Sequence, residues 1–154
     1  MKMLIVDDDK PKLEEIKNFV RKYYSFAEVS EKISYQSGLK EIMTNTPNLI
    51  LLDMNMRTYD PSAVDPTGGK PRHLAGLDIL HQIKRKNLSV KVIVITQFPI
   101  FGGGKDEKTL EEITRTLKTD FSEYFLGTVF YIYSEDSWMQ TLKQYIDKFI
   151  EEGK

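Results

Sequence analysis

The sequence predicts an α/β domain built on a parallel sheet, and two observations indicate this fold class. Short apolar runs alternate with amphipathic stretches along the chain, which is the pattern of strands joined by crossover helices. Two runs, residues 49–52 and 90–95, are uninterrupted and too short for a buried helix, which favours strands buried on both faces. A chain of 154 residues is long enough for one such domain with its own core.

Each predicted strand is followed by a predicted helix. The strands are expected at residues 3–6, 27–33, 49–52, 90–95 and 128–133. Apolar residues at steps of three and four predict the helices, which contain Leu13–Tyr23, Leu39–Met43, Leu77–Ile83, Leu110–Phe121 and Trp138–Ile150. Pro11 suits the first turn of the first helix, and Ser137 with Gln140 fits a capping box at the start of the last.

Two segments interrupt this alternation within a single predicted domain covering residues 1–154. Residues 57–76 contain several Pro and Gly and almost no apolar side chains, so they are expected to form a long loop inserted into the domain. Residues 97–106 form a second irregular segment that includes a run of glycines. A lid, a partner-binding loop and plain disorder all remain open for the longer segment.

The composition excludes several classes of function. Lys and Arg (22) nearly balance Asp and Glu (23), and a net charge of −1 gives no basic footprint for nucleic acid or an anionic membrane. The absence of Cys excludes disulfide scaffolds, thiolate metal sites and cysteine nucleophiles. The first apolar run meets Asp7 too early for a signal peptide, and we expect a cytoplasmic protein.

Acidic residues follow two of the predicted strands. Asp7, Asp8 and Asp9 come after the first strand, Asp53 after the third, and Thr96 ends the fourth. The carboxyl ends of parallel strands meet at one edge of the sheet, where open α/β sheets bind ligands. Carboxylates gathered there suit Mg²⁺, and a carboxylate beside that ion can act as a nucleophile toward phosphorus. A solvated turn with Asp9 as a helix N-cap is the simpler alternative for the first group.

These segments together resemble the receiver domain of two-component response regulators. The resemblance covers nearly the whole chain and rests on the opening strand with its acidic residues (4–9), Ser37-Gly38, the segment 47–56, the segment 76–80 and the strand ending at Thr96. It implies a doubly wound, five-stranded parallel sheet of the flavodoxin-like type, with helices on both faces.

The resemblance also implies roles for individual residues. Asp53 would be the phosphoacceptor, Thr96 the hydroxyl that follows the phosphoryl group, and Tyr131 the switching aromatic residue. Asp8 would bind Mg²⁺ directly and Asp7 would assist through water. The implied Mg²⁺ ligands are Asp7, Asp8, Asp53 and the backbone carbonyl of Asn55.

The chain departs from the receiver pattern at the end of the fifth strand. Receivers have a Lys-Pro pair there whose ammonium contacts the phosphoryl group, and in this sequence Ser134 and Glu135 are assigned to those positions. Loss of that cation would remove a charge-assisted contact. Lys105 or Lys70, on the two irregular segments, are candidates to replace it. Arg57 stands where receivers usually have proline.

Three functions are compatible with these residues. The first is a stand-alone receiver that takes a phosphoryl group on Asp53 from a histidine kinase or phosphotransfer protein. It would signal through protein contacts of the fourth helix, fifth strand and last helix, either with an unknown target or by self-association. The alternative is a pseudo-receiver whose switching does not depend on phosphorylation. An aspartate-dependent phosphatase is disfavoured because Asn55 replaces its acid–base carboxylate, so we do not expect an enzyme.

Overall fold

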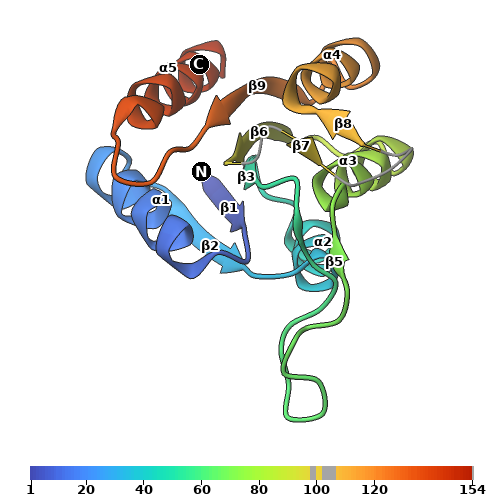
Figure 1. Ribbon diagram of the computed structural model, residues 1–154. Coiled ribbons are helices and arrows are strands. Elements are labelled where there is room, and N and C mark those ends of the chain that lie inside the picture. Colours follow the sequence, from blue (N-terminus) through green and yellow to red (C-terminus); the bar gives the residue numbers. More distant parts are fainter. Residues whose placement is uncertain (98–99, 102–106, 154) are drawn as a thin grey trace.

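A five-stranded parallel sheet lies at the centre of the computed structural model, which describes residues 1–97, 100–101 and 107–153 (Figure 1). The strand order is β2-β1-β3-β6-β9, and every neighbouring pair runs parallel. The strands of this sheet are β1 (Lys2–Val6), β2 (Glu28–Lys32), β3 (Leu49–Leu52), β6 (Lys91–Thr96) and β9 (Phe125–Phe130).

Helices cover both faces of the sheet. Helices α1 and α5 lie on one face, and α2, α3 and α4 lie on the other (Figure 1). The helices are α1 (Lys10–Tyr23), α2 (Tyr35–Asn45), α3 (Ala75–Arg85), α4 (Leu110–Asp120) and α5 (Ser137–Glu152). This is the doubly wound, flavodoxin-like α/β fold that the sequence predicts. Within the described ranges, no helix is both long enough and apolar enough to cross a membrane.

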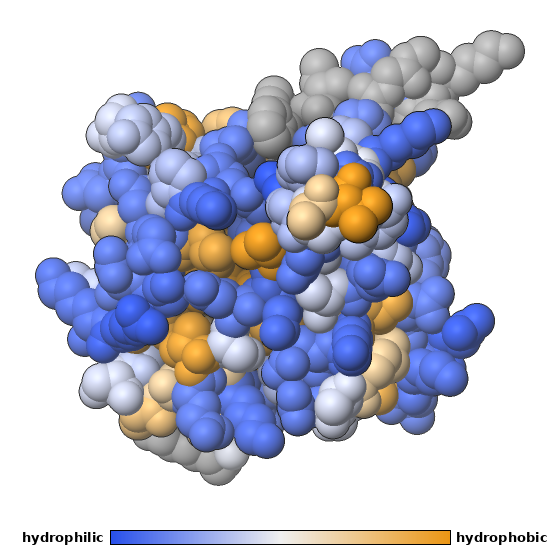
Figure 2. Space-filling model, turned by 90° about the horizontal axis from the view of Figure 1, so that it is seen from below, coloured by the Kyte–Doolittle hydropathy of each residue, from blue (hydrophilic) through white to orange (hydrophobic). Residues whose placement is uncertain are grey.

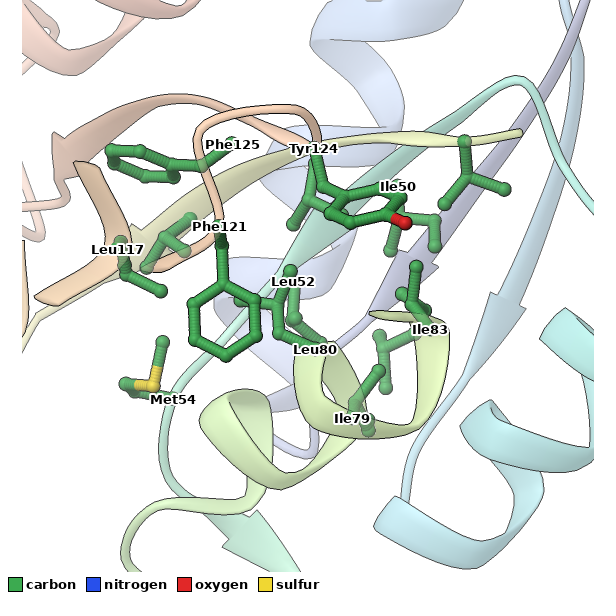
Figure 3. Packing of buried hydrophobic residues seen from close by; sticks show 14 of the residues in the cluster. Ile50, Leu52, Met54, Ile79, Leu80, Ile83, Leu117, Phe121, Tyr124 and Phe125 are labelled. Atoms are coloured by element: carbon green, nitrogen blue, oxygen red, sulfur yellow. The ribbon is translucent and has the colours of Figure 1, made fainter. Parts of the chain in front are cut away.

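The two faces of the sheet bury separate apolar cores, because successive residues of a strand point to opposite faces. Ile50 and Leu52 pack with Ile79 of α3 in the core beneath α2, α3 and α4 (Figure 3). Leu49 and Leu51 of the same strand belong to the core beneath α1 and α5. The sequence prediction that this apolar run is a strand buried on both faces is therefore confirmed.

The last strand of the sheet lies three residues earlier than predicted. The expected range was 128–133, whereas β9 spans Phe125–Phe130. Its interior includes Gly127, a residue type that argues against a strand in a sequence. A Cβ at Gly127 would collide with the ring of Tyr145 on α5, so the glycine allows this helix to approach the strand closely. The predicted position of the sheet edge is therefore wrong on this strand.

The predicted capping box at α5 is also wrong. Ser137 is the first residue of the helix, and the N-cap is Asp136, whose side chain makes no capping hydrogen bond. The Trp138 indole instead donates a hydrogen bond to the carbonyl of Glu135 at 3.0 Å, which fixes the entry into the helix. A reciprocal capping box occurs at α4, between Thr109 and Glu112.

The segment expected as a long loop forms a hairpin that projects from the domain (Figure 1). Its stem is the antiparallel pair β4 (Met56–Arg57) and β5 (Pro71–Arg72). The Asp60 carboxylate accepts hydrogen bonds from Ser34 and Ser37, each at 2.7 Å, and so ties the hairpin to the start of α2. Figure 2 views the molecule from the hairpin side, where apolar residues form small separate groups on a largely hydrophilic surface.

A short strand pair begins in the second irregular segment and ends just after it. β7 (Ile100–Phe101) pairs antiparallel with β8 (Lys108–Thr109), directly before α4. The glycine run of this segment lies outside the described residues.

Candidate functional site

Three carboxylates meet at the carboxyl edge of the sheet. Asp7 and Asp8 follow β1, and Asp53 follows the neighbouring strand β3. The register pairs Val6 with Leu52, so the acidic residues after these two strands are brought side by side. One carboxylate oxygen from each of the three aspartates lies within 4.8 Å of the others. The structure thus brings together the acidic residues that the sequence selected.

Backbone amides hold each carboxylate in place. Asp7 Oδ1 accepts a hydrogen bond from the amide of Asp9 at 2.9 Å, and Asp53 Oδ1 accepts one from Met54 at 2.8 Å. Asp8 Oδ2 accepts a hydrogen bond from the amide of Arg57 at 2.9 Å, which links the site to the hairpin stem. Asp7 and Asp53 are almost completely buried, whereas Asp8 is partly exposed.

A lysine that sequence reasoning missed lies among these carboxylates. Lys12 Nζ is 2.7 Å from Asp7 Oδ2 and 3.2 Å from Asp53 Oδ2, and it donates to the carbonyl of Ile95 at 2.8 Å. These contacts engage all three N–H donors of the ammonium. Only 1% of the Lys12 side chain is exposed. The site therefore contains a buried cation bonded to the proposed phosphoacceptor.

Lys12 reaches the site because of its place in the first turn of α1. The Asp9 side chain caps this helix by accepting from the Lys12 amide at 3.3 Å. Lys12 precedes the buried Ile16 by four residues, so it lies on the same helix face as the apolar stripe. This spacing was the available signal, but a lysine next to a helix start is usually solvent-exposed, and we did not select it.

The burial of the cluster shifts the ionisation of its members. Burial raises the pKa of Asp7 to about 7, although the Lys12 ammonium acts in the opposite direction. Burial likewise raises the pKa of Asp53 above its usual value, against the effect of Lys12. Burial would lower the pKa of Lys12, but Asp53 and Asp7 more than offset it, so the pKa is raised and the ammonium stays charged.

Two further residues selected from the sequence, Thr96 and Asn55, carry buried polar side-chain atoms. Thr96 ends β6 directly after Ile95 and is fully buried, and its hydroxyl has no hydrogen-bond partner among the described residues. The side-chain oxygen of Asn55, two residues after Asp53, is likewise buried without a partner within those residues. Unmet polar atoms of this kind are expected where a ligand completes the hydrogen bonds. The metal-binding role of the Asn55 carbonyl stays a prediction.

Tyr131 and Ser134 occupy different environments at the end of β9. The Tyr131 amide donates to the carbonyl of Thr96 at 2.9 Å, so Tyr131 stands at the sheet edge directly after the strand. Its side chain is buried, its hydroxyl hydrogen-bonds the carboxylate of Glu15, and its ring centroid is 5.9 Å from Lys12 Nζ. Ser134 is exposed in the turn before α5 and has a left-handed backbone (φ 68°).

This geometry corrects the placement of Ser134. The sequence assigned Ser134 to the position of the receiver lysine, on the expectation that the strand continued to residue 133. Because β9 ends at Phe130, Ser134 lies beyond the end of the strand, exposed to solvent, and in the described part of the chain its side chain hydrogen-bonds none of the three carboxylates. Tyr131 is the first residue after β9, and its side chain contacts Glu15 of α1. Its predicted role as a switching aromatic is not tested by this arrangement.

Of the two lysines proposed as substitutes, the structure describes only Lys70. Lys70 is exposed in the hairpin, where its carbonyl accepts a hydrogen bond from Thr58, and among the described residues its ammonium pairs with none of the three aspartates. Lys105 lies outside the described residues.

The donor set fits a hard divalent cation. The three carboxylates supply oxygen ligands, which Mg²⁺ prefers, and the partly exposed Asp8 leaves an approach from solvent. Lys12 competes for one oxygen each of Asp7 and Asp53, while their second oxygens are held by backbone amides. Such an ion would share the carboxylates with the ammonium.

Comparisons with known proteins agree with this fold. No protein-family model matches the chain. The Detocs response regulatory protein DtcB of Enterobacter cloacae is 27% identical over 143 residues, which cover 92% of this chain and 95% of that protein. An uncharacterised protein of Sinorhizobium fredii, y4jR, is 24% identical over 143 residues, covering 93% of this chain and 95% of its own.

Solved receiver domains share the architecture. A response regulator receiver domain from Clostridium thermocellum superimposes with a TM-score of 0.64 at 21% identity, covering 99% of this chain and 95% of that one. A CheY-like receiver from Methanospirillum hungatei gives a TM-score of 0.62 at 19% identity, with 98% and 97% covered. The chain has the receiver fold of response regulators.

Proposed function

We propose that this protein is a receiver that accepts a phosphoryl group on Asp53 in a Mg²⁺-dependent reaction and signals through protein contacts. The observation that carries the proposal is the meeting of Asp7, Asp8 and Asp53 at the carboxyl edge of a receiver fold. The similarity to a response regulatory protein over nearly the full length of both chains supports it. We propose the cytoplasm as its place of action.

The chemistry required of Asp53 is nucleophilic attack on phosphorus. One carboxylate oxygen forms the new O–P bond, and the bond from phosphorus to the donor's nitrogen or oxygen breaks, its electron pair leaving with the donor group. The Met54 amide bonded to Oδ1 orients the Asp53 carboxylate. A Mg²⁺ ion held by the three aspartates would supply positive charge to the phosphoryl oxygens. The Thr96 hydroxyl, which has no hydrogen-bond partner among the described residues, would donate to one of them.

The proposal includes no enzymatic action on other molecules. The position two residues after the nucleophile is Asn55, whose amide cannot exchange a proton as a general acid and base. We therefore expect only phosphorylation and dephosphorylation of the protein itself. The phosphoryl donor would be a histidine kinase or a phosphotransfer protein.

The face formed by α4, β9 and α5 is the proposed contact surface for the target. β9 is the edge strand of the sheet, and three large apolar residues at its end remain exposed: Phe130 (41%), Ile132 (37%) and Tyr133 (69%). Exposed aromatic side chains of this kind are enriched in protein interfaces. A second copy of the chain is the alternative occupant to an unrelated target.

Phosphorylation by a small acyl phosphate tests the proposal. Wild type and Asp53→Asn would be incubated with the phosphodonor, with Mg²⁺ or with a chelator, and separated on a phosphate-affinity gel. The proposal predicts a retarded band for wild type with Mg²⁺ that disappears in Asp53→Asn and in chelator. Absence of the band, under conditions that label a typical receiver, would instead support a pseudo-receiver that binds partners without phosphorylation.

A further inference from the structure

The ammonium of Lys12 lies in a buried set of acceptors, unlike the ammonium of a surface lysine, which is solvated by water. Its ammonium is buried in contact with Asp7, Asp53 and the carbonyl of Ile95, at 2.7, 3.2 and 2.8 Å. Burial of a charge is costly unless every donor is satisfied by well-placed partners. The partners here come from three different strand ends, β1, β3 and β6, so the ammonium lies where these strands converge.

The residue at the end of the last strand explains why the cation comes from a helix. Tyr131 stands there, and its hydroxyl is bonded to Glu15, one turn along α1 from Lys12. Its ring lies beside the lysine, with 5.9 Å between the ring centroid and Nζ. The aromatic ring fills the space between the strand end and α1, and it packs against Trp138 of α5 on its other side, at 5.3 Å between centroids. Tyr131 carries no positive charge, so the end of the last strand supplies no cation to the carboxylates.

We infer that Lys12 is the phosphoryl-contacting cation of this protein, supplied by the first turn of α1 in place of the lysine that receivers have after the fifth strand. The inference rests on the proposed function of Asp53 and adds a further residue to it. In the unphosphorylated protein Lys12 bonds Asp53 Oδ2. When that carboxylate becomes an acyl phosphate, it loses its own negative charge while the phosphoryl oxygens carry negative charge, and Lys12 donates its hydrogen bond to one of them. No proton is transferred from Lys12.

The position of Lys12 also couples the carboxylates to β6. Ile95, whose carbonyl accepts from Lys12, is followed by Thr96, whose hydroxyl is unpartnered within the described residues. A change in the hydrogen bonds of Lys12 on phosphorylation thus acts on the residue next to the proposed phosphoryl-contacting hydroxyl. If Lys12 only neutralised the buried carboxylates, bound Mg²⁺ would take over that role, and Lys12 would not be needed for phosphorylation at saturating Mg²⁺.

Two measurements on Lys12→Met separate these roles, since the substitution keeps an unbranched side chain as far as Cε and removes the charged ammonium. Mg²⁺ affinity is measured by titration calorimetry, and the rate of phosphorylation by the small acyl phosphate is measured at saturating Mg²⁺. We expect Lys12→Met to bind Mg²⁺ more tightly, by about threefold or more, because an ammonium no longer competes for the carboxylates. We expect phosphorylation to be slower by about tenfold to a hundredfold, the effect of one charge-assisted hydrogen bond.

Control variants complete the experiment. Lys17→Met, on the same helix but in surface pairs with Glu14 and Glu31, should leave both quantities unchanged. Lys12→Gln removes the charge but keeps an N–H donor for the Ile95 carbonyl. The same two measurements would be made on Lys12→Gln if Lys12→Met fails to fold. Adding Tyr131→Lys to Lys12→Met returns a cation from the strand end and should restore part of the rate.

The outcomes distinguish the two proposals. If Lys12→Met is phosphorylated at the wild-type rate once Mg²⁺ is saturating, Lys12 is a structural counter-ion and the inference fails, although Asp53 remains the phosphoacceptor. If wild type itself is not labelled, or Asp53→Asn is labelled equally, the proposed function fails. Slower labelling of Lys12→Met with unimpaired Mg²⁺ binding supports both.

Discussion

Arg57 and Asp8 join the projecting hairpin to the acidic edge of the sheet. The Arg57 amide donates to Asp8 Oδ2 at 2.9 Å, and the Arg57 Nε lies 3.6 Å from the same oxygen. The most exposed carboxylate of the site is thus held by the first residue of the segment 57–76. The composition of this segment, rich in Pro, Gly and polar residues, gives no sign of this contact.

Replacing Arg57 with alanine should strengthen Mg²⁺ binding. The guanidinium is partly exposed and competes with the metal for Asp8, so its loss should raise the affinity by about two- to fivefold, the scale of a solvent-exposed ion pair. The backbone amide bond to Asp8 would persist. Titration calorimetry measures the change. Arg72→Ala is the matched control. Arg72 lies on β5, the other strand of the hairpin stem, and forms a comparable ion pair with Asp78 of α3, so its loss should not change the Mg²⁺ affinity.

The pKa of Asp7, raised by burial to about 7, predicts how the metal-free protein responds to pH. In the unfolded chain the carboxyl ionises near pH 4, so between about pH 4 and 7 the folded state binds more protons than the unfolded state. The free energy of unfolding therefore falls as pH rises through this window, by up to about 1.4 kcal/mol per pH unit from this group.

Urea denaturation with chelator present, at about pH 5 and pH 7, measures this dependence. Asp7→Asn removes the titrating group, so the difference in stability between the two pH values should become smaller than in wild type. An equal pH dependence in the two proteins would show that Asp7 is ionised throughout the window.

Gly76 allows α3 to begin directly against the phosphoacceptor segment. A Cβ at this position would lie 2.7 Å from the carbonyl oxygen of Asp53 and 3.1 Å from the Met54 Cα, both of which are backbone atoms. Gly76→Ala should therefore destabilise the fold by about 1–3 kcal/mol and slow phosphorylation, because the Asp53 segment must move. Gly153→Ala, whose Cβ would have only ordinary contacts from 3.5 Å outward, is the control for thermal denaturation.

Asp60 holds the hairpin against α2 through the hydroxyls of Ser34 and Ser37. Asp60→Ala should speed hydrogen exchange at the Tyr59 amide, which is bonded to the Gly68 carbonyl, because the hairpin loses its anchor. Mass-spectrometric exchange detects the change. Val64→Ser, at a fully exposed position of the same segment, should leave the rates unaltered. Equal protection in Asp60→Ala would mean that the stem alone orders the hairpin.

The sheet and the acidic cluster could be predicted because both follow from local pattern. The runs at 49–52 and 90–95 are strands, and parallel topology alone places Asp7 and Asp53 together. The helix start at Asp9 with Pro11 in its first turn was predicted too. Each of these depends on neighbouring residues or on a rule that holds for all parallel sheets.

The misplaced features depend on contacts between distant segments. Gly127 weakened the strand signal, and only the ring of Tyr145, which a Cβ at this position would meet, shows what the glycine accommodates. Lys12 resembled a solvated helix residue, and only the arrangement of three strand ends around it makes it part of the site. Lys70 and Lys105 were proposed as replacement cations because they lie on the two irregular segments, whereas Lys12 belongs to the first turn of α1.

The most direct test of the account identifies the residue that carries the phosphoryl group. Wild-type protein phosphorylated with the small acyl phosphate and Mg²⁺ would be reduced with borohydride, which converts an aspartyl phosphate to homoserine, and the digested peptides would be sequenced by mass spectrometry. The account predicts homoserine at position 53 and unchanged aspartate at positions 7 and 8. Homoserine at Asp7 or Asp8, or none in a protein that had been labelled, would contradict it.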